Sequence, residues 1–211
     1  DDRQPIIIAG VGRFGQVVNR MVTSSGFRTT VIDNDLKTIQ LLRRFGFKGY
    51  FGDPTRPDLL KAAGLDEARV LVAAMDDKAA TTRLVTYARQ MRPDLHIIAR
   101  AYDREHVYEL FRAGADDIVR EMFDSALRVG RYVLEGVGLS KPEAFELERL
   151  FFDLDRASVR ALAEVWRPGV PLDQNEEYMA LAKQLNRDLE TSLIGRSAAQ
   201  AEARAPRDAA E

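Results

Sequence analysis

Residues 6–15 read IIIAGVGRFG, and the next apolar run along the chain ends in VIDND at residues 31–35. The three glycines, Gly10, Gly12 and Gly15, have the spacing G-x-G-x-x-G between an apolar run and a helical pattern. Because each glycine costs conformational entropy, this spacing indicates a tight turn with a specific use rather than a neutral linker. The stretch therefore predicts a strand, a glycine turn and a helix, as at the start of an open α/β sheet.

The first two thirds of the chain alternate between short apolar runs and helical patterns. The expected strands cover residues 5–9, 29–33, 48–51, 70–75, 96–101 and 117–119. The expected helices cover residues 14–25, 36–45, 57–63, 78–91 and 104–113. This alternation predicts an α/β fold, a Rossmann-like doubly wound parallel sheet of about six strands.

The pattern becomes wholly helical after Arg120. Residues 121–139 and 140–166 read as two long helices, the second opened by Ser140 as N-cap with Pro142 in its first turn. A last polar helix is expected at residues 176–193, and the tail beyond it is expected to be disordered because it has few bulky residues. We therefore divide the chain into three parts: a Rossmann-like domain (1–120), crossover and dimerisation helices (121–168), and a peripheral helix with a disordered tail (169–211).

Composition limits the classes of function. The 211 residues carry a net charge of -2, so the sequence gives no sign of a nucleic-acid partner. There is no cysteine, and the two histidines lie in different expected elements, which argues against a metal centre or a histidine-based triad. The sequence contains no run of about 18 apolar residues, which a membrane-spanning helix would need. The chain begins DDRQP without methionine, as a piece of a longer polypeptide would.

The glycine turn predicts a nucleotide site. Gly10 allows the sharp turn, Gly12 lets a phosphate approach the backbone, and Gly15 lets the helix pack close to the strand. The N–H groups that open the helix then face the anion, and Arg13 adds a charged contact. Asp33 is placed to accept from the ribose hydroxyls and disfavours a 2′-phosphate, so we expect AMP or NAD(H). The neighbouring candidates at the same edge of the sheet are Phe14, Asn34 and Ala74.

Further candidates follow the later strands, and each has a second interpretation. Asp53 and Thr55 are placed either to reach the adenine or to cap the helix that contains Pro57. Arg100 is placed either to meet a phosphate or to form a surface ion pair. Asp76 is expected to act as a helix cap rather than as a ligand.

Several blocks together resemble a known family. GRFGQ (residues 12–16), FGDPTR (51–56) and DDIVRE (116–121) occur in the order found in the KTN or RCK domain of Kef-type potassium efflux systems. These are bacterial transporters regulated by glutathione, and the resemblance covers about residues 5–165. The glycine turn alone is common to RCK domains in general, whereas these blocks in this order are far more specific than the glycine motif.

The resemblance implies a regulatory role on the cytoplasmic face of the bacterial inner membrane. In this family the domain forms a homodimer, belongs to the same polypeptide as a potassium/proton antiporter, and binds AMP or NAD(H) as a structural ligand. Glutathione keeps the transporter closed, and bulky glutathione S-conjugates open it. An ancillary oxidoreductase subunit is a further implied partner.

The resemblance also assigns glutathione contacts. They fall on Arg20, Arg120 and Phe45, and on Asp155, where the family has asparagine. The two arginines can each bind one glutathione carboxylate, and Asp155 can accept from the ammonium group. Phe45 is expected to pack at the end of its helix until a bulky adduct displaces it.

We interpret the chain as a sensor and not as an enzyme, because nothing after Arg120 provides a substrate domain with a general acid or base. Two alternatives remain at this point. One is an RCK domain of a potassium uptake system or channel that responds to nucleotide alone. The other is a fragment of an NAD-dependent oxidoreductase.

Overall fold

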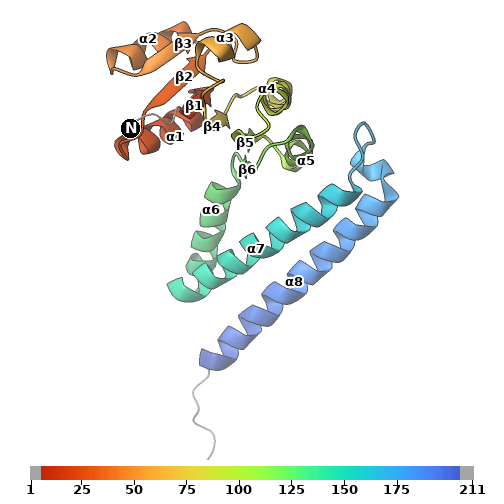
Figure 1. The fold of residues 1–211 in the computed structure, drawn as a ribbon. Helices are drawn as coiled ribbons and strands as arrows, with labels where there is room; N and C mark the ends of the chain where they lie inside the picture. Colours follow the sequence, from red (N-terminus) through yellow and green to blue (C-terminus); the bar gives the residue numbers. More distant parts are fainter. Residues whose placement is uncertain (1–5, 205–211) are drawn as a thin grey trace, which may run out of the picture. The chain divides into compact units, whose positions relative to one another are not determined.

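A computed structural model describes residues 6–204 and divides the chain into two compact units, with the boundary between Glu121 and Met122 (Figure 1). The first unit is a six-stranded parallel sheet with helices on both faces, and the second is helical. Residues 1–5 and 205–211, which include part of the tail expected to be disordered, lie outside the described residues.

The sheet has the strand order β3-β2-β1-β4-β5-β6, and every pair of neighbours is parallel. Its strands are β1 (Ile6–Ala9), β2 (Thr29–Asp33), β3 (Lys48–Phe51), β4 (Val70–Ala73), β5 (His96–Ala101) and β6 (Asp117–Arg120). This confirms the expected doubly wound sheet. The direction of winding changes between β1 and β4, which is where open α/β sheets bind their ligands.

The helices that alternate with these strands also match the sequence pattern to within a residue at each end. They are α1 (Arg13–Ser24), α2 (Leu36–Arg44), α3 (Pro57–Ala62), α4 (Lys78–Met91) and α5 (Arg104–Ala113). The one clear difference among the strands is β4, which ends at Ala73 and not at Met75. The backbone N–H of Ala74 still donates to the carbonyl of Ala9 at 2.8 Å, after which the chain turns away from the sheet.

Apolar residues cover both faces of the sheet because successive side chains of a strand point to opposite sides. Ile8 on β1 lies in a cluster with Ile39 of α2, and Phe14 of α1 packs against that cluster. Ile7, which precedes Ile8 in β1, lies in the other cluster, which also contains Leu84 of α4. The unbroken apolar runs of the sequence are thus explained by strands that are buried on both sides.

The glycine turn depends on close backbone contacts. Gly10 has φ +90°, and a Cβ there would lie 2.7 Å from the carbonyl oxygen of Ala74. A Cβ on Gly15 would overlap the carbonyl oxygen of Gly10. These two glycines therefore let α1 begin directly against β1 and β4, as the sequence predicts.

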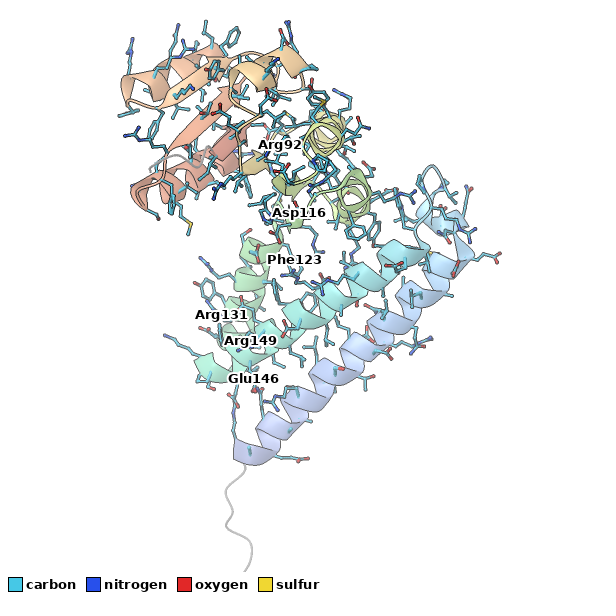
Figure 2. All side chains as sticks on the ribbon, viewed as in Figure 1. Arg92, Asp116, Phe123, Arg131, Glu146 and Arg149 are labelled. Atoms are coloured by element: carbon cyan, nitrogen blue, oxygen red, sulfur yellow. The ribbon has the colours of Figure 1, made fainter. Side chains whose placement is uncertain are left out.

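The second unit consists of three helices and a short 3-10 turn, and no helix among residues 6–204 is long and apolar enough to span a membrane. Its elements are α6 (Phe123–Gly136), α7 (Lys141–Val165), η1 (Leu172–Gln174) and α8 (Glu176–Arg204). Ser140 and Glu143 form a capping box at the start of α7, which confirms the expected cap. Arg131 of α6 pairs with Glu148 of α7 at 3.1 Å and so ties the first two helices together (Figure 2).

Helix α8 is longer than expected. It continues through Arg204, whereas the sequence predicted an end near Leu193 and disorder beyond. Residues 195–204 are rich in alanine, which favours helix, and polar contacts hold them to α7. Arg196 pairs with Glu146, which Figure 2 labels on α7, and Arg204 pairs with Glu143. The low hydrophobicity of this segment therefore did not predict its structure correctly, because ion pairs rather than apolar contacts hold it to α7.

We predict that Gly15→Ala destabilises the first unit by about 1–3 kcal/mol, the usual cost of overpacking, because its Cβ meets backbone that cannot yield. Urea unfolding followed by circular dichroism measures the change. Gly195→Ala in α8 is the matched control, since its Cβ meets nothing within 4 Å, and we expect it to be neutral or stabilising. Equal stability of wild type and Gly15→Ala would contradict the role of this contact.

Candidate functional site

A cavity of about 400 Å³ opens at the carboxyl edge of the sheet, around the glycine turn. Its walls come from the segments that follow β1, β2, β3 and β4, which the parallel order brings to one edge. The lining residues that the sequence singled out for the site are Gly10, Gly12, Asp33, Asn34, Asp53 and Ala74. The lining residues that it did not assign to the site are Asp35, Thr38, Pro54, Met75, Asp76, Asp77 and Ala80.

Asp33 organises the glycine turn. Its Oδ2 accepts from the backbone N–H of Val11 at 2.7 Å, and its Oδ1 accepts from the N–H of Asp35 at 2.8 Å. The carboxylate at the end of β2 is thereby fixed beside the turn that follows β1. Each oxygen keeps further acceptor capacity, so the same group can accept from a ligand hydroxyl in the cavity.

Gly12 is the residue of the glycine turn that has free space in front of its Cα atom. It is the N-cap of α1, it is exposed, and a Cβ added there would meet only the Oδ2 of Asp76 at 3.9 Å. Arg13 is the first residue of α1 and is exposed, whereas Phe14 is half-buried. The first N–H groups of α1 have no side-chain cap. The arrangement leaves backbone donors and open space at one place, which suits an anion.

Asp53 and Thr55 form a turn of their own. The Oδ1 of Asp53 accepts from the N–H of Thr55 at 2.9 Å and from its hydroxyl at 2.8 Å. The N-cap of α3 is Arg56, followed by Pro57, so the expectation that Asp53 or Thr55 caps this helix was wrong. The turn instead presents Asp53 to the cavity.

Asp77, and not Asp76, caps α4. The Oδ1 of Asp77 accepts from the N–H of Ala80 at 2.6 Å, which is the usual N-cap bond. The sequence reads MDDK, and the pattern alone could not decide which aspartate begins the helix. Asp76 is therefore left for another contact, which is with Arg100.

Arg100 is buried, with only 7% of its side chain exposed, so the expectation of a surface ion pair was wrong. Its guanidinium pairs with Asp76 at 2.8 Å and with Glu121 at 2.5 Å. It also lies 5.4 Å from the ring centroid of Phe14. The side chain points from β5 to the ends of the two neighbouring strands and to the first turn of α1.

The cavity is strongly acidic, since five aspartates line it. Hydrogen bonds keep two of them ionised: the hydroxyl of Thr38, followed by the N–H of Lys37, lowers the pKa of Asp35. The N–H and then the hydroxyl of Thr55 lower the pKa of Asp53. Among residues 6–204 no group of three or more His, Cys, Asp or Glu side chains is arranged to hold a metal ion. Each of these carboxylates offers hydrogen-bond acceptors to the cavity.

The residues that the resemblance assigns to glutathione come from different elements. Arg20 is exposed on α1, and Arg120 is half-buried at the end of β6. Asp155 is buried on α7 in the second unit. Their grouping into one site stays a prediction.

Phe45 differs from its expected state, because 70% of it is exposed. It follows α2 directly as the C-cap residue, four positions after Leu41, which is also exposed. The buried side of α2 is formed by Ile39, with Leu42 packed beside it. The expectation that Phe45 packs at the helix end within this chain was wrong, because it lies on the outer side of the helix.

Family models match both parts of the chain. Residues 6–121 match the TrkA-N domain, and residues 125–208 match the C-terminal domain of the potassium efflux system KefB. The chain belongs to the Kef family of regulatory TrkA-N domains. This is a family of regulatory domains of potassium transport systems and not a family of enzymes.

Relatives and solved structures agree with this membership. The chain is 46% identical over 158 residues to the glutathione-regulated potassium-efflux protein KefC of Enterobacter sp. (strain 638), which is 74% of this chain and 25% of that protein. It is 39% identical to the Shewanella denitrificans Kef C-terminal domain in its AMP-bound form, with a TM-score of 0.72 over 77% of this chain and 99% of that one. The GsuK channel bound to NAD matches at 25% identity and a TM-score of 0.54, over 63% of this chain and 23% of the channel. The chain thus spans about a quarter of the length of the curated KefC relative.

Proposed function

We propose that this chain is a ligand-sensing domain that gates a potassium efflux system and carries an adenine nucleotide in the cavity at the glycine turn. The single observation that carries the nucleotide assignment is the open Gly12 at the start of α1, with the fixed carboxylate of Asp33 beside it. A phosphate on the helix N–H groups and a ribose on Asp33 fit this arrangement. The AMP-bound Shewanella denitrificans relative supports AMP as the ligand.

The remaining candidates are assigned by their position around that nucleotide. Arg13 is placed to add a charged contact to the phosphate. Asn34 and Asp53 line the cavity beyond Asp33 and supply polar contacts to the ribose and adenine, and Ala74 lines the opposite wall. Thr55 supports Asp53 through its two hydrogen bonds.

Gly12→Ala separates binding from folding. The added Cβ meets nothing closer than 3.9 Å in the protein, so we expect the stability of the unliganded domain to stay unchanged. The same Cβ occupies the space where the phosphate meets the backbone, and we expect AMP affinity to fall by about tenfold or more, a loss of about 1.4 kcal/mol. Isothermal titration calorimetry measures the affinity. Unchanged AMP affinity would show that the phosphate does not lie on this turn.

Glutathione is the proposed regulatory ligand. The KefC relative is named as glutathione-regulated, and this chain carries Arg20 and Arg120, two cations for the two carboxylates of the tripeptide. Asp155 is the proposed acceptor for its ammonium group, and the exposed ring of Phe45 is the proposed sensor of bulky adducts. The ligand shifts the gate only through its difference in affinity for the closed and open states, so glutathione and its S-conjugates must favour opposite states.

We predict that Arg120→Ala weakens glutathione binding and leaves AMP binding unchanged, because the two ligands use separate sites. Removing a charge-assisted hydrogen bond costs about 1.5–3 kcal/mol, or roughly 10- to 150-fold in affinity. Calorimetry with each ligand measures both effects, and Arg69→Ala, an exposed arginine just before β4, is the control. Equal loss of both ligands would argue against separate sites.

Calorimetry with glutathione also distinguishes the proposed function from the alternative, an RCK domain that responds to nucleotide alone. The NAD-bound GsuK structure supports an RCK domain that responds to nucleotide alone. Such a domain would bind NAD or AMP but show no heat of binding with glutathione. We also propose that this chain is part of a longer protein that contains the transporter. In that protein the domain would lie at the cytoplasmic face of the inner membrane, where an ancillary oxidoreductase subunit is a further proposed partner.

A homodimer is the proposed assembly, and α6 offers a surface for it. Val129 and Val133 of α6 and its C-cap residue Val137 are exposed and follow one another at intervals of four residues, so they form an apolar stripe along one side of the helix and its end. Met122, seven positions before Val129, extends the stripe and is also exposed. A second copy of this chain would bury the same stripe on both partners, as a two-fold interface requires.

We predict that Val133→Glu converts the dimer to a monomer, because it places a charge in the middle of the apolar stripe. Light scattering coupled to size-exclusion chromatography measures the mass. Arg128→Glu, which adds an acid on another side of α6, is the control and should leave the dimer intact. A wild type that is monomeric at all concentrations would contradict the assembly itself.

A further inference from the structure

The buried side chain of Arg100 connects three separate segments of the first unit. Its guanidinium reaches Asp76 after β4 at 2.8 Å and Glu121 after β6 at 2.5 Å. The ring of Phe14, in the first turn of α1, lies 5.4 Å from it. One positive charge therefore lies between a wall of the cavity and the last residue of the unit.

The two acids that pair with Arg100 differ in how far they are exposed to solvent. The side chain of Asp76 is 86% exposed, whereas that of Glu121 is 24% exposed and that of Arg100 is 7% exposed. A buried guanidinium needs a partner, and Glu121 remains one if Asp76 turns into solvent. Asp76 is thus the exchangeable partner and Glu121 the constant one. Glu121 is also fixed through its backbone, since its N–H donates to the carbonyl of Ala101 at 2.9 Å.

Asp76 also lies where an anion would approach. Its Oδ2 is the nearest atom to the space in front of Gly12, 3.9 Å from the position of an added Cβ. A phosphate on the glycine turn would bring a like charge close to this carboxylate. Repulsion then favours a state in which Asp76 leaves Arg100, and the guanidinium is shared between the phosphate and Glu121.

We propose that Glu121 is a positioning residue for the nucleotide phosphate and acts through Arg100. Neither Glu121 nor Arg100 lines the cavity, but Arg100 pairs with Asp76 in the cavity wall, and Glu121 sets how much of the guanidinium's charge is available there. Occupancy of the cavity and the pairing of Glu121 are then coupled, and the coupling is reciprocal. Glu121 is the last residue of the first unit and immediately precedes Met122.

This inference rests on the proposed nucleotide site, and the test compares AMP with adenosine, which has no phosphate. We expect Glu121→Gln to tighten AMP binding by about fivefold or more, the lower end of usual coupling between sites, because Arg100 loses its constant partner. Adenosine affinity should stay unchanged. Asp117→Asn, at the other end of β6, is the control for a general loss of negative charge and should leave both affinities unchanged. Calorimetry on the whole chain measures all of them.

Two further variants show whether the effect passes through Arg100. In an Arg100→Met background, Glu121→Gln should no longer change AMP affinity, which would make the two substitutions non-additive. Asp76→Asn leaves the Arg100–Glu121 pair in place and tests separately, also if Arg100→Met does not fold, whether the exchangeable partner of Arg100 opposes the phosphate. It should tighten AMP binding, and not adenosine binding, because it removes the repulsion at the phosphate.

The outcomes are distinct. AMP binding that is identical in wild type and Glu121→Gln would overturn the inference and leave the nucleotide site standing, whatever the result for Asp76→Asn. Equal changes for AMP and adenosine would show a general structural effect and would also overturn it. A wild type that binds no AMP would overturn the proposed nucleotide site and the inference together.

Discussion

The close approach of the backbone to itself at the glycine turn is the constraint on which the rest of the first unit depends. Gly15 lies against the carbonyl of Gly10, and Gly10 lies against the backbone of Ala74, with no room for a Cβ at either position. These contacts place the start of α1 directly over the point where the sheet changes its direction of winding. Gly12 is then exposed at the cavity because its two neighbouring glycines are tightly packed.

The electrostatics of the cavity follow from this placement. Five aspartates surround a helix start that favours negative charge, and hydrogen bonds or ion pairs from the protein occupy Asp33, Asp35, Asp53, Asp76 and Asp77. A ligand here meets ionised acceptors for its hydroxyls and backbone donors for its phosphate. The one buried cation at this edge, among the described residues, is Arg100. A sensor needs an element with two arrangements, and the proposed exchange of Asp76 beside Glu121 would provide one.

The helical unit is held together by a different balance of forces. Helix α7 buries Leu147 and Leu162 together with a few other residues, whereas the end of α8 is attached through arginine–glutamate pairs. Ion pairs that solvent can reach each contribute little to the free energy of folding and are screened by salt. We therefore expect the end of α8 to be attached less firmly than the part of α7 that buries leucine. The apolar stripe on α6 has no cover among the described residues of this chain, which is the physical reason for proposing a second copy.

The amino-acid pattern was sufficient to predict the sheet, its helices and the glycine turn. Short apolar runs such as Ile6–Ala9 that alternate with helical patterns predict strands buried on both faces, and glycine at positions 10 and 15 reflects contacts that exclude any Cβ. These are local signals, and the strand bounds they predict agree with the structure almost to the residue.

The partners of the charged side chains at the sheet edge became known from the fold alone. That Asp77 caps α4 while Asp76 pairs with Arg100 depends on β4 and β5 lying side by side, and the contact with Glu121 depends on β6 lying beside β5. The exposure of Phe45 likewise depends on which side of α2 faces the sheet. Neighbours on a chain are fixed by its sequence, but neighbours across a sheet are fixed by strand order, and therefore the glycine turn could be read directly while the charge network could not.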